Sequence, residues 1–250
     1  MKIIISPAKK MRNECNFDIA MSTPVFIDKS KQLHKYLKKL SFEELKKILV
    51  CNDAIAQLNY ERYQSMDLNQ EGNPALLSYD GIQYKYMAPH IFEDSYYEYV
   101  NDRVRILSGF YGILKPFDKV VPYRLEMQAK IQTYFCMNLY DFWNGELYRE
   151  LVKEDDEILN LASYEYSKII ERYLSKDIKY VTCIFGEMID GKVKEKGVYV
   201  KMARGEMVRY MAENNIQKIE GIKDFDRLGF HFEETLSDEK RYVFIKANKK

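Results

Sequence analysis

Cysteine and histidine are scarce in this sequence and lie far apart. The 250 residues contain four cysteines and three histidines, with no CxxC pair and no HExxH motif. This spacing argues against a disulfide framework, structural zinc or a metal hydrolase, so we expect no metal and no cofactor. Isolated cysteines of this kind are expected to be buried, reduced thiols. The residues concerned are Cys15, Cys51, Cys136, Cys183, His34, His90 and His231.

Long apolar runs are also absent. No stretch approaches the roughly 20 apolar residues that a membrane-spanning helix needs, so we expect no membrane partner. The first ten residues hold only a short apolar run before their lysines, too short for the apolar region of a signal peptide. These features predict a cytoplasmic protein. Neither GxGxxG nor GxxxxGKS/T occurs, which argues against the usual nucleotide-binding loops.

The overall composition is that of a globular protein. Hydrophobic residues make up 46% and charged residues 31%, with 39 Lys and Arg against 38 Asp and Glu. The net charge of +1 means that any nucleic-acid surface must be a local patch. No internal repeat or Pro/Ser-rich linker divides the chain, so residues 1–250 are predicted to form a single domain.

The hydrophobic pattern predicts strands mixed with helices. Buried strands are expected over Lys2–Ser6, Val104–Leu107 and Glu157–Leu161, and helices over Lys29–Leu40, Ser41–Val50, Asp53–Tyr63, Leu139–Val152 and Arg204–Asn214. Asp190-Gly191 predicts a hairpin between Tyr180–Glu187 and Lys192–Lys201, and a last hairpin joins Gly229–Glu234 to Arg241–Ala247. We therefore predict a mixed α/β (α+β) fold with a mixed central sheet, C-terminal β-hairpins and surrounding helices.

The first group of polar residues follows the first predicted strand. Ser6, Lys9 and Lys10 stand where a loop leaves the carboxyl end of a strand, a common place for ligands in α/β proteins. A hydroxyl and two ammonium groups suit a phosphate or carboxylate, and Lys9 could act as a base or nucleophile if desolvated. The alternative is that Ser6 caps a turn and both lysines are solvated.

A second group spans residues 105–127. Ser108, Tyr111, Arg124 and Glu126 lie in and after a Gly-containing loop, and its two glycines would let the backbone approach a ligand closely. The alternative is a rigid loop in which Arg124 and Glu126 pair with neighbours.

A third group, Lys201–Arg209, lies at a predicted strand-to-helix junction. Free N–H groups at a helix start, beside Lys201 and Arg204, would bind an anion, whereas Arg209 lies about 140° around the helix from Arg204. Alternatively, the methionines here simply face the core.

Positive charge is concentrated in one segment. Asp28–Lys47 holds seven lysines and three acids, a net +4, so the remainder of the chain sums to −3. The asymmetry predicts a phosphate-facing patch on two adjacent helices, or else a solvated lysine face.

Several motifs together resemble the YaaA family of peroxide-stress proteins. They are IISPAKK at 4–10, LSGFYGILKPFDKVVPYRLEM at 107–127, FWNGEL at 142–147, NLASYEY at 160–166 and KMARGEMVRYM at 201–211. The resemblance covers essentially the whole chain. It implies a bacterial protein that protects against hydrogen peroxide by limiting damage linked to free intracellular iron. It also implies a family-specific fold with a basic cleft and DNA binding.

The resemblance further implies a helix-hairpin-helix element, which binds DNA phosphates through backbone N–H groups and basic side chains. Its best match is Phe42–Val50, the turn Cys51–Asn52 and Asp53–Tyr63, a turn without glycine. Lys46, Lys47 and Arg62 would supply its charge.

Two functions follow as hypotheses. In the first, the protein is a DNA-binding stress factor whose largely sequence-independent contacts to duplex or branched DNA use Lys46, Lys47, Arg62, Lys201, Arg204 and Arg209. In the second, the residues at the strand ends form an enzyme pocket for a nucleobase or nucleotide. These candidates are Ser6, Lys9, Ser108, Tyr111, Arg124, Glu126 and Arg204. A small anionic ligand is the other partner that these residue types suggest. A deep pocket shared by these groups would favour the enzyme, and a shallow basic groove would favour DNA binding.

Overall fold

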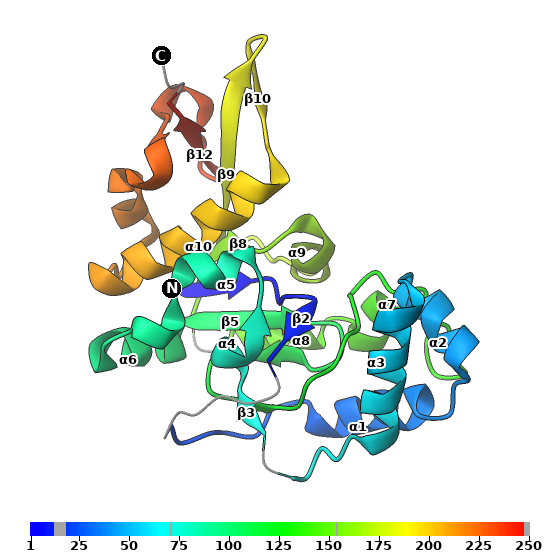
Figure 1. Cartoon of the computed structure of the whole chain (residues 1–250). Coiled ribbons are helices and arrows are strands. Elements are labelled where there is room, and N and C mark those ends of the chain that lie inside the picture. The colour runs from blue at the N-terminus through cyan, green and yellow to red at the C-terminus, as the bar shows by residue number, and fades with distance from the viewer. Residues whose placement is uncertain (13–18, 71, 154, 248–250) are drawn as a thin grey trace.

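A computed structural model describes residues 1–12, 19–70, 72–153 and 155–247. The strands of its central sheet are β1 (Lys2–Ile5), β5 (Val104–Ser108), β6 (Gly112–Leu114), β8 (Glu157–Leu161), β9 (Lys179–Ile189), β10 (Lys192–Lys194), β11 (Phe230–Phe232) and β12 (Arg241–Lys246). Their order is β11-β12-β9-β8-β1-β5-β6, and β10 pairs with β9 in a hairpin that projects from the body (Figure 1).

The middle of this sheet is parallel and its margins are antiparallel. β12, β9, β8, β1 and β5 run in one direction, while β11, β6 and β10 run against their partners. The central strand β1 is covered on both faces, since Ile3, Ile4 and Ile5 are all 0% exposed. A continuous aliphatic run is the sequence signature of such a strand. The mixed α/β fold predicted from the sequence is therefore confirmed.

Helices and short strand pairs surround the sheet. The helices are α1 (Ile27–Leu37), α2 (Phe42–Leu49), α3 (Asp53–Ser65), α4 (Ala75–Ser78), α5 (Ile82–Met87), α6 (Asp94–Arg103), α7 (Leu139–Trp143), α8 (Glu146–Leu151), α9 (Tyr164–Glu171) and α10 (Gly197–Glu213). Two-residue strands pair as β2 (Lys10–Met11) with β4 (Tyr79–Asp80) and as β3 (Asn73–Pro74) with β7 (Lys119–Val120). Short 3-10 turns occupy Pro89–Ile91, Ile219–Asp224, Arg227–Gly229 and Glu234–Leu236.

Local signals in the sequence place several of these elements correctly. Ser41 begins α2 with the expected capping box: its side chain accepts from the Glu44 N–H, and the Glu44 carboxylate accepts from the Ser41 N–H at 2.8 Å. Asn52 caps α3. The hairpin at Asp190-Gly191 and the last hairpin, β11 with β12, are both confirmed.

Two predicted elements are wrong. The helix expected over Leu139–Val152 is divided into α7 and α8, because Asn144 adopts a positive φ of 48° and Gly145 follows it. The strand expected over Lys192–Lys201 ends at Lys194, and α10 begins at Gly197 rather than Arg204. Lys201–Arg209 therefore lies inside a helix, so the free N–H groups of a helix start are not available at this point to bind an anion.

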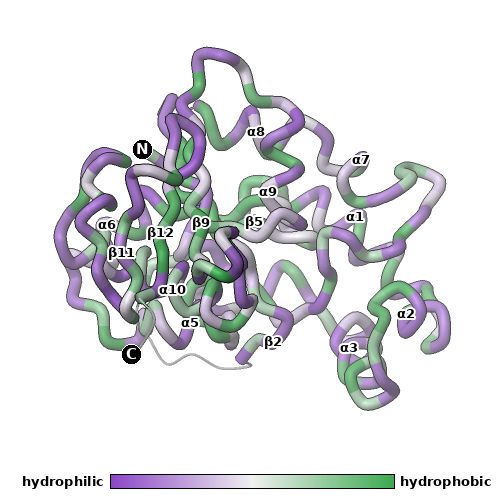
Figure 2. The backbone as a smooth tube through the Cα atoms, turned by 90° about the horizontal axis from the view of Figure 1, so that it is seen from above, coloured by the Kyte–Doolittle hydropathy of each residue, from purple (hydrophilic) through white to green (hydrophobic). Residues whose placement is uncertain are grey.

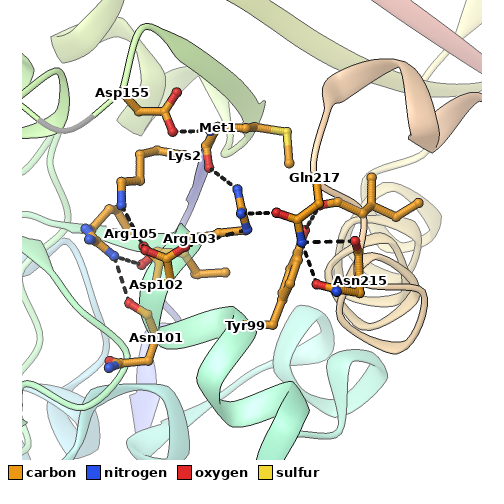
Figure 3. Close-up of polar contacts among 12 residues, drawn as sticks. Met1, Lys2, Tyr99, Asn101, Asp102, Arg103, Arg105, Asp155, Asn215 and Gln217 are labelled. Carbon is orange, nitrogen blue, oxygen red and sulfur yellow. Dashed lines mark hydrogen bonds and ion pairs between the residues drawn. The ribbon is translucent and has the colours of Figure 1, made fainter.

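A polar network fastens the amino end of β1 to its neighbours (Figure 3). Lys2 Nζ donates to the Asp102 carbonyl at 2.8 Å, and Arg103 donates to the Met1 carbonyl at 3.3 Å and to the Gln217 side chain. Tyr99 OH donates to the Ile216 carbonyl at 2.7 Å, just beyond α10. These internal contacts occupy the amino ends of the central strands, so a site is expected at their carboxyl ends.

The tightest helix contact is between α10 and α5. A Cβ at Gly205 would lie 2.1 Å from the Gln83 carbonyl oxygen and 2.9 Å from the Met87 nitrogen. Such separations are far inside van der Waals contact, so only glycine permits this approach.

We expect Gly205→Ala to lower the free energy of unfolding by about 1–3 kcal/mol, because α5 must move away from α10. Gly197→Ala is the matched control on the same helix, since nothing lies within 4 Å of its Cβ position. Urea unfolding of both variants would measure the difference. Equal stability of the two variants would contradict the packing argument.

Candidate functional site

A cleft of about 340 Å³ opens at the carboxyl ends of the parallel strands β1 and β8. Four segments line it: Ser6–Lys10 after β1, Asp80–Tyr84 around the start of α5, Ser163–Tyr166 after β8, and Lys201 with Arg204 on α10. Both views of the backbone place the segment that leads into β2 between α5 and α10 on one side and α3 on the other (Figures 1 and 2).

Ser6 joins the two strand ends. Its Oγ accepts a hydrogen bond from the Ser163 N–H at 2.8 Å and donates to Ser163 Oγ at 3.2 Å. The Ser6 carbonyl accepts from Tyr84 OH at 3.0 Å, which ties the same loop to α5. The Ser6 hydroxyl therefore holds the cleft together, and Ser163 adds a second hydroxyl beside it.

Two basic side chains form ion pairs with the same oxygen of Glu126. Lys9 Nζ lies 3.1 Å and Arg124 Nη2 2.9 Å from Glu126 Oε1. The Lys9 side chain is 63% exposed, so it lacks the desolvation that a nucleophilic lysine needs. Arg124 is only 12% exposed. Among the described residues, no donor reaches the buried Glu126 Oε2.

Close backbone packing holds the Glu126 loop in place. A Cβ at Gly109 would lie 2.4 Å from the Leu125 carbonyl oxygen. Gly112, at a φ of 78°, packs against Trp143. The close approach expected at these two glycines is thus made by the protein's own residues. Tyr63 of α3 donates to the Arg124 carbonyl at 2.7 Å, so α3 is fastened to the same loop.

Ser108 and Tyr111 lie beneath the cleft, in the core. Ser108 Oγ is 2.6 Å from Tyr123 OH and accepts from the N–H groups of Phe110 and Tyr111. Tyr111 OH accepts from the Val121 N–H at 3.1 Å. Burial raises the pKa of Tyr123 to about 12, so this phenol stays protonated. Ser108 and Tyr111 are 0% and 1% exposed and do not line the cleft.

Lys201 and Arg204 face the cleft from one turn of α10. Lys201 is exposed, whereas Arg204 is half-buried, and burial lowers the pKa of its guanidinium. Arg204 Nε and the neighbouring Gln83 Nε2 have no acceptor within the described part of the chain. Gln83 is only 7% exposed. This wall therefore presents buried hydrogen-bond donors without partners.

Glu165 is a cleft residue that the sequence argument did not single out. Its Oε1 accepts from the Gln128 N–H at 3.3 Å. Burial, with a smaller effect of Glu126, raises the pKa of the Glu165 carboxyl. Its position in the sequence could have indicated it, because Ser163 and Glu165 follow the buried strand β8 just as Ser6 and Lys9 follow β1.

Comparison with known proteins identifies the family. The sequence model of the family described as "Peroxide stress protein YaaA" matches residues 1–236. The chain is 63% identical over 247 residues to a UPF0246 protein of Desulfitobacterium hafniense, covering 99% of this chain and 98% of the relative. It is 55% identical to a UPF0246 protein of Lachnoclostridium phytofermentans, covering 99% and 97% of the two chains. The chain belongs to the YaaA family. Membership supports a role in oxidative stress.

Three of the motifs that resemble the YaaA family contribute residues to the cleft. These are the segments 4–10, 160–166 and 201–211. The segment 107–127 reaches it through the Lys9–Glu126 pair. The groups proposed from the sequence thus converge in part. They meet in a pocket lined by the Glu165 carboxylate and by the basic residues Lys9, Lys10, Lys201 and Arg204.

The remaining basic candidates lie elsewhere. Lys46 pairs with Asp53 at 2.5 Å, whereas Lys47 is exposed and makes no ion pair with any residue that the structure describes. Arg62 is half-buried, near Val121 and Pro122 at the far end of α3. Arg209 pairs with Glu213 at 2.6 Å, outside the cleft lining.

The cysteines that the structure describes are free thiols. Cys136 and Cys183 are buried and Cys51 is half-buried, all as free thiols, and Cys15 lies outside the described residues. In the described ranges, no three His, Cys, Asp or Glu side chains gather into a metal site. Over the same ranges, the helices are too short or too polar to cross a membrane.

We expect Lys9→Ala and Arg124→Ala to differ sharply in stability, although both cations pair with the same oxygen. The exposed Lys9 contributes less than about 1 kcal/mol. Loss of the buried Arg124 leaves Glu126 poorly compensated and should cost about 3–5 kcal/mol. Urea unfolding measures both values. If Lys9→Ala is as destabilising as Arg124→Ala, the site assignment for Lys9 fails.

With the fold intact, Lys9→Ala should lower peroxide protection in cells.

Proposed function

We propose that this protein binds DNA during the response to hydrogen peroxide and so limits damage linked to free intracellular iron. The proposal rests on its membership in the YaaA family and on the helix-hairpin-helix element expected beside the cleft. In this hairpin, α2 and α3 are joined by Val50–Asn52.

The turn of this hairpin is the observation that carries the proposal. Val50 adopts the left-handed conformation, with a φ of 46° and a ψ of 60°, and its side chain is 72% exposed. Glycine ordinarily occupies this position after a helix, and a β-branched residue there is strained. Backbone strain of this kind is concentrated at functional sites. The strained, exposed tip supports a contact with a partner.

Donors and positive charge are available at the same tip. The first N–H groups of α3 have no acceptor within the helix, except that Asn52 Oδ1 accepts from Ile55. Lys47 has no ion-pair partner among the described residues, and Lys46 neutralises Asp53. Further positive charge lies in the cleft, which is lined by Lys9, Lys10, Lys201 and Arg204. A backbone-following contact of this type is independent of base sequence.

Phosphate binding offers a physical route to protection from iron. A protein that neutralises DNA phosphates displaces the cations condensed on them. Ferrous iron bound at phosphates is one such cation, and it produces hydroxyl radicals from peroxide next to the DNA. Displacing it would move this reaction away from the backbone without any metal site in the protein.

We expect Lys47→Gln to weaken binding to duplex DNA equally on all sequences. Loss of one phosphate contact should reduce the slope of log affinity against log salt by about 0.9. The double variant of Lys46 and Lys47 should reduce it by roughly one to two units, because Asp53 also loses its partner. Fluorescence anisotropy across salt concentrations is the measurement.

Lys192→Gln is the control for this experiment. Lys192 is exposed on the β9–β10 hairpin, which lies away from α2 and α3 in Figure 1. We expect its affinity and salt slope to be unchanged. If Lys47→Gln behaves like Lys192→Gln, the hairpin does not contact DNA phosphates.

The cysteines should be dispensable for peroxide protection. Burial raises the pKa of the thiols of Cys51, Cys136 and Cys183, whereas a peroxide sensor needs a lowered pKa and an exposed thiolate. Cells that carry a variant without cysteines should survive peroxide as well as the wild type. Loss of protection by a normally folded variant would show that thiol chemistry is required.

A further inference from the structure

The cleft wall formed by α5 and α10 has the chemistry of an anion site. Arg204 Nε and Gln83 Nε2 are buried donors that no acceptor in the described ranges satisfies. Leaving such groups unpaired is costly, most of all for a charged guanidinium. Gly205, which follows Arg204 on α10, packs directly against the Gln83 carbonyl of α5. The fold thus maintains an expensive arrangement that a bound anion would relieve.

The surroundings add a second cation and hydroxyl groups. Lys201 lies one turn before Arg204 on α10, in the same cleft lining. Ser6 and Ser163 stand on the lining at the strand ends. Two cations, an amide and the Ser163 hydroxyl match the several oxygens and double charge of a phosphate monoester.

The cleft also contains a hydrogen-bond acceptor. Glu165 lines it as a hydrogen-bond acceptor: its Oε1 accepts from the Gln128 N–H at 3.3 Å, and the Met127 backbone also bonds this carboxylate. A carboxylate would repel a second phosphate but would accept from an amino or ring N–H group. The volume of about 340 Å³ lies within the range of small-ligand pockets and is too small for a duplex.

We propose that the cleft binds one phosphate monoester that also carries an N–H donor, the chemistry of a mononucleotide, with its phosphate on Arg204, Gln83 and Lys201. The source is a free nucleotide or the 5′-phosphorylated end of a DNA strand. The site is separate from the α2–α3 hairpin, so its failure would leave the DNA-binding proposal standing.

The probes are AMP, adenosine, and a short single-stranded oligonucleotide with and without a 5′-phosphate. We expect AMP to bind the full chain at least tenfold more tightly than adenosine in calorimetry. At a hundredfold excess over its Kd, AMP should raise the melting temperature by about 5 °C. Selective binding of the 5′-phosphorylated oligonucleotide in place of AMP would support the same chemistry with DNA ends as the source.

Arg204→Met separates a ligand site from a structural role. Removing a guanidinium whose buried Nε has no acceptor among the described residues should raise the melting temperature of the free protein, and it should weaken AMP binding about 10- to 100-fold. Arg209→Met, on the same helix but outside the cleft lining, should leave AMP binding unchanged. Lys201→Gln, at an exposed position, should weaken AMP binding several-fold without changing stability and serves as the second variant.

Three results would overturn the proposal. The first is that neither AMP nor the phosphorylated oligonucleotide binds at millimolar concentration. The second is that AMP and adenosine bind equally, and the third is that AMP binding is unchanged in both Arg204→Met and Lys201→Gln. The DNA-binding proposal is tested separately, by the salt dependence of duplex binding in Lys47→Gln, so the two proposals can fail independently.

Discussion

The parallel pairing of β1 with both β5 and β8 is the constraint on which the cleft depends. Register places Ile5 beside Ile106 on one side and Leu161 on the other, so the residues that follow β1 and β8 leave the sheet at one edge. Ser6 and Ser163 meet there because the strands end together. The free energy of this arrangement comes from the aliphatic core, which leaves the polar residues at the edge available for chemistry.

Local sequence signals predicted the elements that local physics determines. The isoleucines of β1, the capping box of Ser41 and the Asp190-Gly191 turn each act within a few residues. The start of α10 was misplaced because Val198, Tyr199 and Val200 favour a strand when read alone. In the fold, buried Val200, Ala203 and Met207 follow helical spacing, and packing against α5 outweighs the local preference.

The composition of the site could be predicted only in part. Ser6, Lys9, Lys201 and Arg204 were recognised by residue type and position, yet their meeting depends on pairs far apart in sequence. Lys9 and Glu126 are separated by 117 positions, and Ser6 and Ser163 by 157. A single sequence shows no trace of such pairings. Residue types also did not separate the buried Ser108, which supports the loop, from the groups that face the cleft.

The way α10 is held has a kinetic consequence for anything that enters the cleft. Gly205 is pressed against α5 near the middle of the helix, and Tyr99 donates to the Ile216 carbonyl beyond its end. A wall packed along a neighbouring helix in this way does not swing as a lid. Exchange of a bound molecule would therefore be ungated, with its rate set by the breaking of contacts rather than by an opening motion of the protein.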